Sequence, residues 1–157
     1  DVMNKQSVKM WENAFDVNLK SVFQITQCIE DILKRNAPSS IINISSIYGT
    51  YAPDLTIYKG TKMYNPASYA ATKAGMINFT KWLSKVLSPK VRVNCISPGG
   101  IFRNQPKKFV KKYVRKTLLN RMGREEDVSN AILFLSSELS HYITGQNLIV
   151  DGGYSLT

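Results

Sequence analysis

Three short apolar segments, separated by long stretches of helical periodicity, constrain the fold of this chain more than any other feature of its sequence. They occupy residues 41–45, 91–96 and 147–150, and the first is β-branched, as buried strands are. Because strands that alternate with long helices pair side by side through right-handed crossovers, these segments predict a parallel sheet. The predicted fold class is therefore α/β, with three strands and helices flanking the sheet.

Four helices are predicted around these strands. Helical periodicity runs from Ser7, the predicted N-cap, to Ala37-Pro38, which ends the first helix. A second helix, rich in Ala, Lys and Leu, spans residues 67–87, and a fourth opens with the acidic residues 125–127. The third is amphipathic, and its apolar side comprises Phe109, Val110, Tyr113, Val114 and Leu118.

The length and composition favour one globular unit. The 157 residues are predicted to form a single domain that buries roughly 70% of the surface of the unfolded chain, and 43% hydrophobic residues exclude a disordered tail. The longest apolar run, residues 131–135, is far shorter than the about twenty residues of a membrane span, so no membrane partner is expected. Two cysteines without a signal sequence predict reduced thiols in the cytoplasm, and a single histidine predicts no metal site.

The net charge of +10 is concentrated in one segment. Residues 102–124 hold nine basic and no acidic residues, whereas the rest of the chain holds 12 basic and 11 acidic residues. Positive charge that is confined to one segment predicts one anion-attracting site and no nucleic-acid partner. The nine basic residues are Arg103, Lys107, Lys108, Lys111, Lys112, Arg115, Lys116, Arg121 and Arg124.

Acid/base chemistry is predicted near the strand ends, because ligands of parallel sheets bind beyond the carboxyl ends of the strands. Tyr69 is a candidate acid/base, but a free phenol has a pKa of about 10. Lys73, one helical turn away on the same face, would stabilise the phenolate and lower that pKa. Ser46 follows the first strand and offers a hydroxyl to hold a substrate oxygen. Asn18 is a candidate to hold a water that relays protons through Lys73.

Five short motifs, spread over nearly all of the chain, resemble the short-chain dehydrogenase/reductase family in type and order. The resemblance implies the C-terminal part of a doubly wound, Rossmann-like sheet. It also implies an NAD- or NADP-dependent oxidoreductase that acts on a carbonyl or hydroxyl group and forms a homodimer or homotetramer. The motifs are Val17-Asn18-Leu19, Ile44-Ser45-Ser46, Tyr69-x-x-x-Lys73-Ala74-Gly75, Asn94-x-x-x-Pro98-Gly99 and the segment from Ile143 to Gly153.

The resemblance also places the nicotinamide end of NAD or NADP in this chain. The family's pyrophosphate motif, Gly-x-x-x-Gly-x-Gly, does not occur in these 157 residues, so residues 1–157 alone are expected to be inactive. The alternative is a non-catalytic remnant that only dimerises, through the helices that begin near Ser7 and Ala67. The implied cofactor contacts are Tyr69, Lys73, Pro98, Gly99, Gly100 and Ile101.

A second Tyr-x-x-x-Lys pair, Tyr58 and Lys62, competes with Tyr69 and Lys73 for the catalytic assignment. The family's usual spacing between its catalytic Ser and Tyr favours Tyr58. Helix chemistry favours Tyr69, because a Gly lies within the first pair and an Asn-Pro follows it, and both disrupt helices. We therefore assign Tyr69, and residues 49–66 become a loop insertion beside the site.

The insertion and the basic segment carry the substrate predictions. Tyrosines in and beside the insertion are candidates to stack on sugars or bases. In the alternative interpretation, they only pack the loop against the rest of the domain. The loop resembles that of bacterial members linked to surface polysaccharides and flagellin modification, the flagellin modification protein A group.

By resemblance, residues 102–124 form the substrate lid, and their charge predicts an anionic substrate. The candidates are an acidic or phosphorylated sugar, a nucleotide-sugar, or a ketoacyl group on an acyl carrier protein. The alternative is a solvated helix face that binds no ligand. The candidate substrate contacts are Tyr48, Tyr58, Arg103, Lys107 and Lys108.

Overall fold

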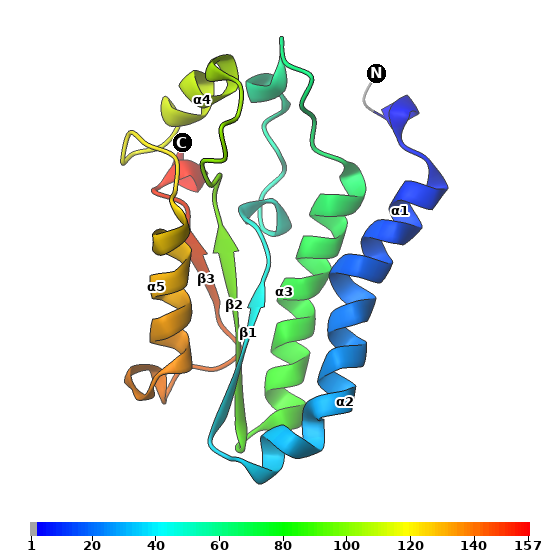
Figure 1. Ribbon diagram of the computed structural model, residues 1–157, viewed down its shortest axis with the longest axis vertical. Helices are drawn as coiled ribbons and strands as arrows, with labels where there is room; N and C mark the ends of the chain where they lie inside the picture. Colours follow the sequence, from blue (N-terminus) through cyan, green and yellow to red (C-terminus); the bar gives the residue numbers. More distant parts are fainter. Residues whose placement is uncertain (1–2) are drawn as a thin grey trace.

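The sheet has three parallel strands in the order β1-β2-β3 (Figure 1). The computed structural model describes residues 3–157, and its strands are β1 (Ser39–Ile44), β2 (Val91–Pro98) and β3 (Asn147–Val150). All three run in the same direction, so their carboxyl ends meet at one edge of the sheet. The α/β fold predicted from the apolar segments is confirmed.

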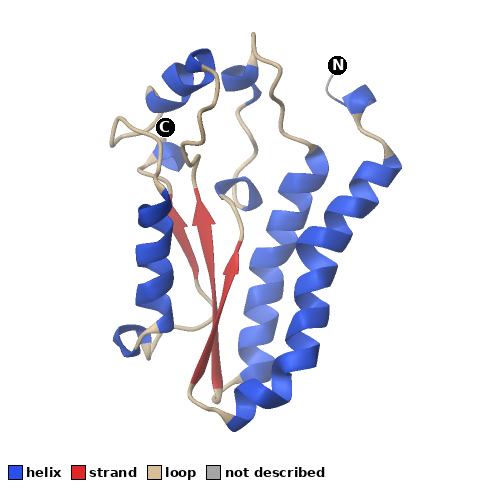
Figure 2. Ribbon diagram, viewed as in Figure 1, coloured by secondary structure: helices blue, strands red, loops and turns tan. Residues whose placement is uncertain are grey.

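Helices cover both faces of this sheet. Helices α2 (Ser21–Arg35) and α3 (Ala67–Leu87) lie on one face, and α5 (Glu125–Ser136) lies on the other (Figures 1 and 2). The core between α3 and β2 contains side chains that are almost wholly buried, and β2 is the most buried of the three strands. They are Leu83, Leu87, Val91 and Val93, with Leu33, Ile41 and Phe79 packed against them.

The first predicted helix is present but contains a wide turn. Helix α1 (Val8–Phe15) begins where the Ser7 hydroxyl accepts a hydrogen bond from the Met10 backbone N–H at 3.2 Å, as the predicted N-cap requires. A π-helical turn over Asp16–Lys20 then joins α1 to α2. Such turns are rare inside helices and often occur at functional sites. This turn contains Asn18.

The lid helix is shorter than the sequence pattern predicts. Helix α4 (Lys107–Val114) starts after Pro106, and the backbone turns out of the helix beyond Val114. There the Tyr113 carbonyl accepts hydrogen bonds from the Lys116 backbone N–H at 3.0 Å and from the Thr117 hydroxyl at 3.1 Å, which satisfy it at the helix end. Leu118, predicted on the apolar face of this helix, lies beyond its end and is 58% exposed.

Helix α3 has the predicted bounds, 67–87, and carries the candidate acid/base pair at its start. Between β1 and α3 the chain forms a long connection with two short 3₁₀ turns, Ile47–Gly49 and Leu55–Tyr58. This connection and α4 lie together above the carboxyl ends of the strands (Figure 1). Within residues 3–157, no helix combines the length and apolar character needed to span a membrane.

Candidate active site

A cavity of about 410 Å³ lies at the carboxyl ends of β1 and β2. Nine predicted site residues line it: Ser46, Tyr48, Tyr58, Tyr69, Lys73, Pro98, Gly99, Gly100 and Ile101. Four others do not: Asn18, Arg103, Lys107 and Lys108. The structure therefore brings the candidate acid/base residues and the candidate nicotinamide loop to one cavity, and leaves the predicted lid cations outside it.

Tyr69 and Lys73 lie on successive turns of α3 and face the same space. The Lys73 ammonium lies 5.7 Å from the centre of the Tyr69 ring and donates a hydrogen bond to the Ile44 carbonyl at 2.9 Å. Burial lowers the pKa of Lys73. The last residue of β1 thus anchors the ammonium beside the phenol, where a positive charge stabilises a phenolate.

The two serines after β1 make different hydrogen bonds. The Ser45 hydroxyl donates to the Lys73 carbonyl at 2.7 Å and ties this turn to α3. The Ser46 hydroxyl accepts from the Tyr48 backbone N–H at 3.2 Å, which leaves its own hydrogen free to donate to a ligand.

Gly49 lies so close to α3 that no larger residue fits. A Cβ atom at this position would lie 2.7 Å from the carbonyl carbon and oxygen of Lys73 and 2.9 Å from the Ser45 hydroxyl oxygen. The backbone of α3 supplies two of these three neighbours and cannot rotate away. Gly49 is therefore required for the close approach between the Ser46 turn and the Lys73 turn.

Asn18 contacts the turn of α3 that carries Tyr69 and Lys73 from outside the cavity. Its amide nitrogen donates to the Thr72 hydroxyl at 3.1 Å, and that hydroxyl donates to the Tyr69 carbonyl at 2.9 Å. The π-helical turn positions this amide against α3. Its role in holding a water for Lys73 stays a prediction.

The competing pair, Tyr58 and Lys62, does not lie on an α-helix. Tyr58 ends a 3₁₀ turn, and Lys62 is exposed in the loop that follows. The Tyr58 hydroxyl donates to the Tyr48 hydroxyl at 3.3 Å, and its ring packs on Phe109. Burial raises the pKa of both Tyr48 and Tyr58, so these hydroxyls stay protonated at neutral pH. Tyr58 is therefore a wall of the cavity and a poor general base.

Six residues of the cavity wall were not predicted as site residues, and three of them, Ile44, Ser45 and Ile47, flank the predicted Ser46. Phe109 and Tyr113 come from the apolar face of α4, and Asn65 comes from the end of the insertion. The amphipathic pattern predicted that the α4 pair is buried, and only the folded position of α4 shows that it encloses the cavity. Asn65 was interpreted only as part of the Asn-Pro that disrupts a helix.

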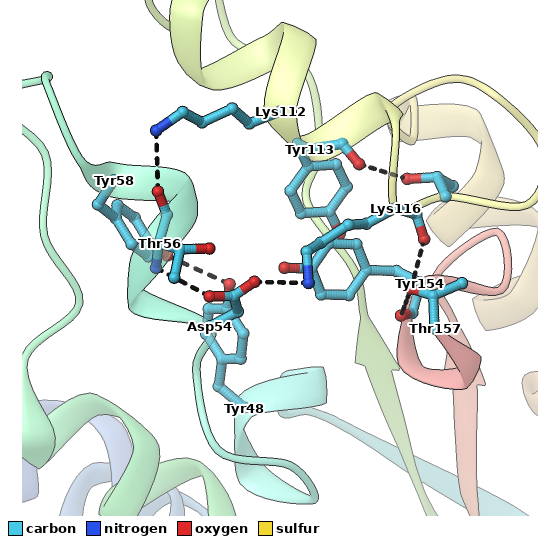
Figure 3. Close-up of polar contacts among 10 residues, drawn as sticks. Tyr48, Asp54, Thr56, Tyr58, Lys112, Tyr113, Lys116, Tyr154 and Thr157 are labelled. Atoms are coloured by element: carbon cyan, nitrogen blue, oxygen red, sulfur yellow. Dashed lines mark hydrogen bonds and ion pairs between the residues drawn. The ribbon is translucent and has the colours of Figure 1, made fainter.

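Two lysines of the predicted lid contact the insertion loop. The Lys116 ammonium pairs with the Asp54 carboxylate at 2.6 Å, and the Lys112 ammonium donates to the Thr56 carbonyl at 2.9 Å (Figure 3). The Lys112 ammonium also donates to the Lys59 carbonyl at 2.8 Å. We call these contacts the lid–loop latch. Part of the positive charge predicted to face a substrate is therefore used inside the chain.

Five of the remaining lid charges fall into two groups. Arg103 pairs with Glu125 at 2.6 Å, and Arg121 pairs with Asp127, so neither is a free anion site. Three cations on the outer side of α4 make no ion pair within residues 3–157. They are Lys107, Lys111 and Arg115, and they line a surface groove together with Phe102, Val110 and Val114.

Removing the Asp54 carboxylate is expected to loosen the lid–loop latch. Lys116 holds the pKa of Asp54 at about 2, below its ordinary 3.8, so the pair stabilises the fold at pH 4 and above and loses this effect as the pH falls through about 2. We expect Asp54→Asn and Lys116→Met each to lower the melting temperature by about 1–3 °C at pH 6, and the double variant to add little.

The difference from wild type should shrink between pH 4 and pH 2. Lys90→Met, an exposed lysine at the far end of the sheet, is the matched control and should melt like the wild type at both pH values. Strictly additive effects of Asp54→Asn and Lys116→Met would contradict the latch.

Comparison with known proteins identifies the family. A family model described as "Enoyl-(Acyl carrier protein) reductase" matches residues 2–155. The chain belongs to the short-chain dehydrogenase/reductase family, a family of oxidoreductases, as the five motifs implied.

Individual relatives agree with this family. The chain is 37% identical over 151 residues to the 3-oxoacyl-[acyl-carrier-protein] reductase FabG of Thermotoga maritima, and 34% identical over 144 residues to the post-translational flagellin modification protein A of Campylobacter coli. Each match covers 91% of this chain and 56% of the relative, so the chain spans little more than half the length of these relatives. A short-chain dehydrogenase from Leptospira borgpetersenii with bound NAD+ superposes with a TM-score of 0.89 at 42% identity, over 97% of this chain and 59% of that one.

Proposed function

We propose that this chain carries the acid/base site of an NAD(P)-dependent oxidoreductase that interconverts a carbonyl and a hydroxyl group. One observation carries the proposal: Tyr69, Lys73 and Ser46 line one cavity beside the Pro98–Ile101 segment. The family supports a nicotinamide cofactor, since the Leptospira relative binds NAD+ and a 4-hydroxyisoleucine dehydrogenase, 26% identical, binds NADH.

The residues present fit the nicotinamide end of such a cofactor. Lys73 uses one of its three N–H donors on the Ile44 carbonyl, which leaves two for ribose hydroxyls. Pro98, Gly99, Gly100 and Ile101 line the cavity beside it and would lie against the nicotinamide. When bound, the cofactor supplies or accepts the hydride.

The chain's own residues would then manage the proton and the oxygen. In reduction, Ser46 donates a hydrogen bond to the carbonyl oxygen, and Tyr69 transfers its phenolic proton to that oxygen as the hydride reaches the carbon. The Lys73 ammonium stabilises the resulting phenolate. In oxidation the same groups act in reverse, and the Tyr69 phenolate takes the proton from the hydroxyl.

Two substrate classes are consistent with this site. The loop resemblance to members linked to surface polysaccharides and flagellin modification supports an anionic sugar or nucleotide-sugar, and a flagellin modification protein is among the relatives. The FabG relative supports a ketoacyl group on an acyl carrier protein. Both carry negative charge outside the reacting group. The unpaired cations on the outer side of α4 suit either class.

Charge reversal on the outer side of α4 tests the anionic substrate. We expect the triple variant Lys107→Glu, Lys111→Glu, Arg115→Glu to raise KM for acetoacetyl-coenzyme A, an anionic probe, by roughly tenfold, because attraction becomes repulsion. KM for ethyl acetoacetate, a neutral ketoester, should change less than twofold. Wild-type KM for the anionic probe should also rise with salt, since exposed charges are screened over about 10 Å at 0.1 M.

The variant Lys90→Glu provides the control, because it adds negative charge far from the lid. Lys108 and Lys112 are left intact in this design: Lys112 holds the insertion loop, and the Lys108 ammonium lies against Gly60. Equal KM values for wild type and the triple variant would mean that the outer cations are only solvated and do not attract the substrate.

The outer faces of α1, α2 and α3 support the proposed homodimer or homotetramer. Trp11, Phe23 and Trp82 are between 43% and 55% exposed there. Exposed aromatic residues are enriched in protein interfaces. Light scattering on the full-length gene product measures the number of subunits, and a monomer would overturn this assignment.

A further inference from the structure

We propose that Asn65 is a specificity-determining residue that accepts a hydrogen bond from a substrate hydroxyl close to the reacting carbonyl. The proposal rests on the oxidoreductase function and narrows its substrate class. The part of the substrate inside the cavity is then neutral and carries a hydroxyl, and a purely alkyl ketone fits less well.

The Asn65 amide presents an unused acceptor in the cavity wall. Its Oδ1 atom is buried and has no hydrogen-bond partner within residues 3–157, although Asn65 lines the same cavity as Ser46 and Tyr69. Buried polar atoms almost always have a partner, and an unpaired one costs free energy. A ligand that donates a hydrogen bond at this point would remove that cost.

The hydrogen bonds of the neighbouring tyrosine hydroxyls explain why Asn65 Oδ1 has no donor. The Tyr58 hydroxyl uses its hydrogen on Tyr48, so the interaction between Asn65 and Tyr58 leaves the amide nitrogen as the donor. Both tyrosines stay protonated because burial raises their pKa values, and neither of them donates a hydrogen bond to Asn65 Oδ1. The amide is therefore oriented with Oδ1 unpaired.

The position of Asn65 relative to the acid/base is fixed by the chain. Pro66 follows it in an extended conformation and starts α3, and Tyr69 lies in the first turn of that helix. On the other side, the Thr61 hydroxyl donates to the Tyr58 carbonyl and accepts from the Met63 N–H, which folds the end of the insertion. A group bound at Asn65 is thus held near the carbonyl whose oxygen Tyr69 protonates.

The charges of the cavity wall favour a neutral group at this point. Among the described residues that line the cavity, Lys73 alone has a charged side chain, and it is engaged with Ile44 beside Tyr69. A carboxylate or phosphate next to Asn65 would face an amide oxygen and two protonated phenols without a cation of its own. An alkyl chain would leave the amide oxygen unpaired and remove it from water.

A pair of ketones that differ by one hydroxyl tests the proposal. Reduction of 2-hydroxycyclohexanone and cyclohexanone by the full-length gene product is followed through NAD(P)H absorbance. We expect wild-type kcat/KM to favour the hydroxyketone at least tenfold, and Asn65→Leu to lower this ratio at least fivefold. A merely structural role would lower both values together and leave the ratio unchanged, which would overturn the proposal.

Asn130→Leu, the same substitution at an exposed position on α5, is the matched control and should leave the ratio at its wild-type value. If neither ketone is reduced, the proposed function fails for these ketones, and the inference about Asn65 is decided by binding. Saturation-transfer NMR should then detect the hydroxyketone more strongly than cyclohexanone on the wild type, and equally on Asn65→Leu. Equal binding of both ketones to the wild type would overturn the inference.

Discussion

Replacing Tyr69 by phenylalanine is expected to lower kcat by about 10³-fold or more in the full-length gene product. The substitution removes only the hydroxyl that exchanges a proton with the substrate, and general acid/base groups contribute typically 10²–10⁴-fold. The ring remains beside the Lys73 ammonium, so the dissociation constant for NADH or NADPH should stay within about threefold. Single-turnover kinetics at saturating cofactor measure the first quantity, and fluorescence titration measures the second.

Tyr58→Phe is the matched control for this substitution. It removes a phenolic hydroxyl from the same cavity, but that hydroxyl bonds to Tyr48 and its ring contact with Phe109 is retained. We expect a loss of less than tenfold in kcat. A larger loss from Tyr58→Phe than from Tyr69→Phe would reverse the assignment of the two Tyr-x-x-x-Lys pairs. A wild-type protein that binds cofactor yet reduces no carbonyl compound would favour the non-catalytic, dimerising alternative.

Gly49→Ala is expected to be the second most damaging single change. The new methyl group would lie 2.7 Å from the Lys73 carbonyl carbon, so the Ser46 turn and α3 must move apart. Overpacking of this kind costs typically 1–3 kcal/mol, which corresponds to a fall in melting temperature of roughly 3–10 °C. Because the same shift separates Ser46 from Tyr69, kcat/KM should fall at least tenfold.

Gly75→Ala supplies the comparison on the same helix. Its methyl group would approach only a flexible side-chain atom, Cδ2 of Leu19, at 3.1 Å, and alanine is the better helix former. We expect the melting temperature to stay within about 2 °C of wild type or to rise. Differential scanning calorimetry and steady-state kinetics on the two variants separate the effect of the close approach from that of an added methyl group. Equal behaviour of the two would mean that the turn at Gly49 adapts freely.

The parts of the fold that depend on local sequence were predicted well. The strand at 147–150 and the helix at 67–87 have the predicted bounds, because an apolar β-branched run and an Ala-rich segment after Asn-Pro specify these elements within a few residues. The spacing of Tyr69 and Lys73 predicted their shared face for the same reason. The wide turn at 16–20 was not predicted, since no residue within it differs in type from those of an ordinary helix.

Contacts between individual side chains of distant loops were not predicted. The sequence shows nine positive charges in the lid, but it does not show that Lys116 meets Asp54, which is 62 residues away in the chain. It likewise shows Asn65 as a helix-disrupting residue and not as a cavity wall. Partners of long, flexible side chains are decided by the packing of loops, and local periodicity carries no information about that packing.

The lid–loop latch also limits how new variants of this protein can arise by recombination. A chimera with a crossover between residues 66 and 102 would take the loop from one parent and the lid from the other. The partners Asp54 and Lys116, and likewise Tyr58 and Phe109, would then come from different parents. Such chimeras would bring together segments selected in different backgrounds. Gene-shuffling libraries that alter substrate choice should therefore transfer residues 49–66 and 102–124 as one inherited module.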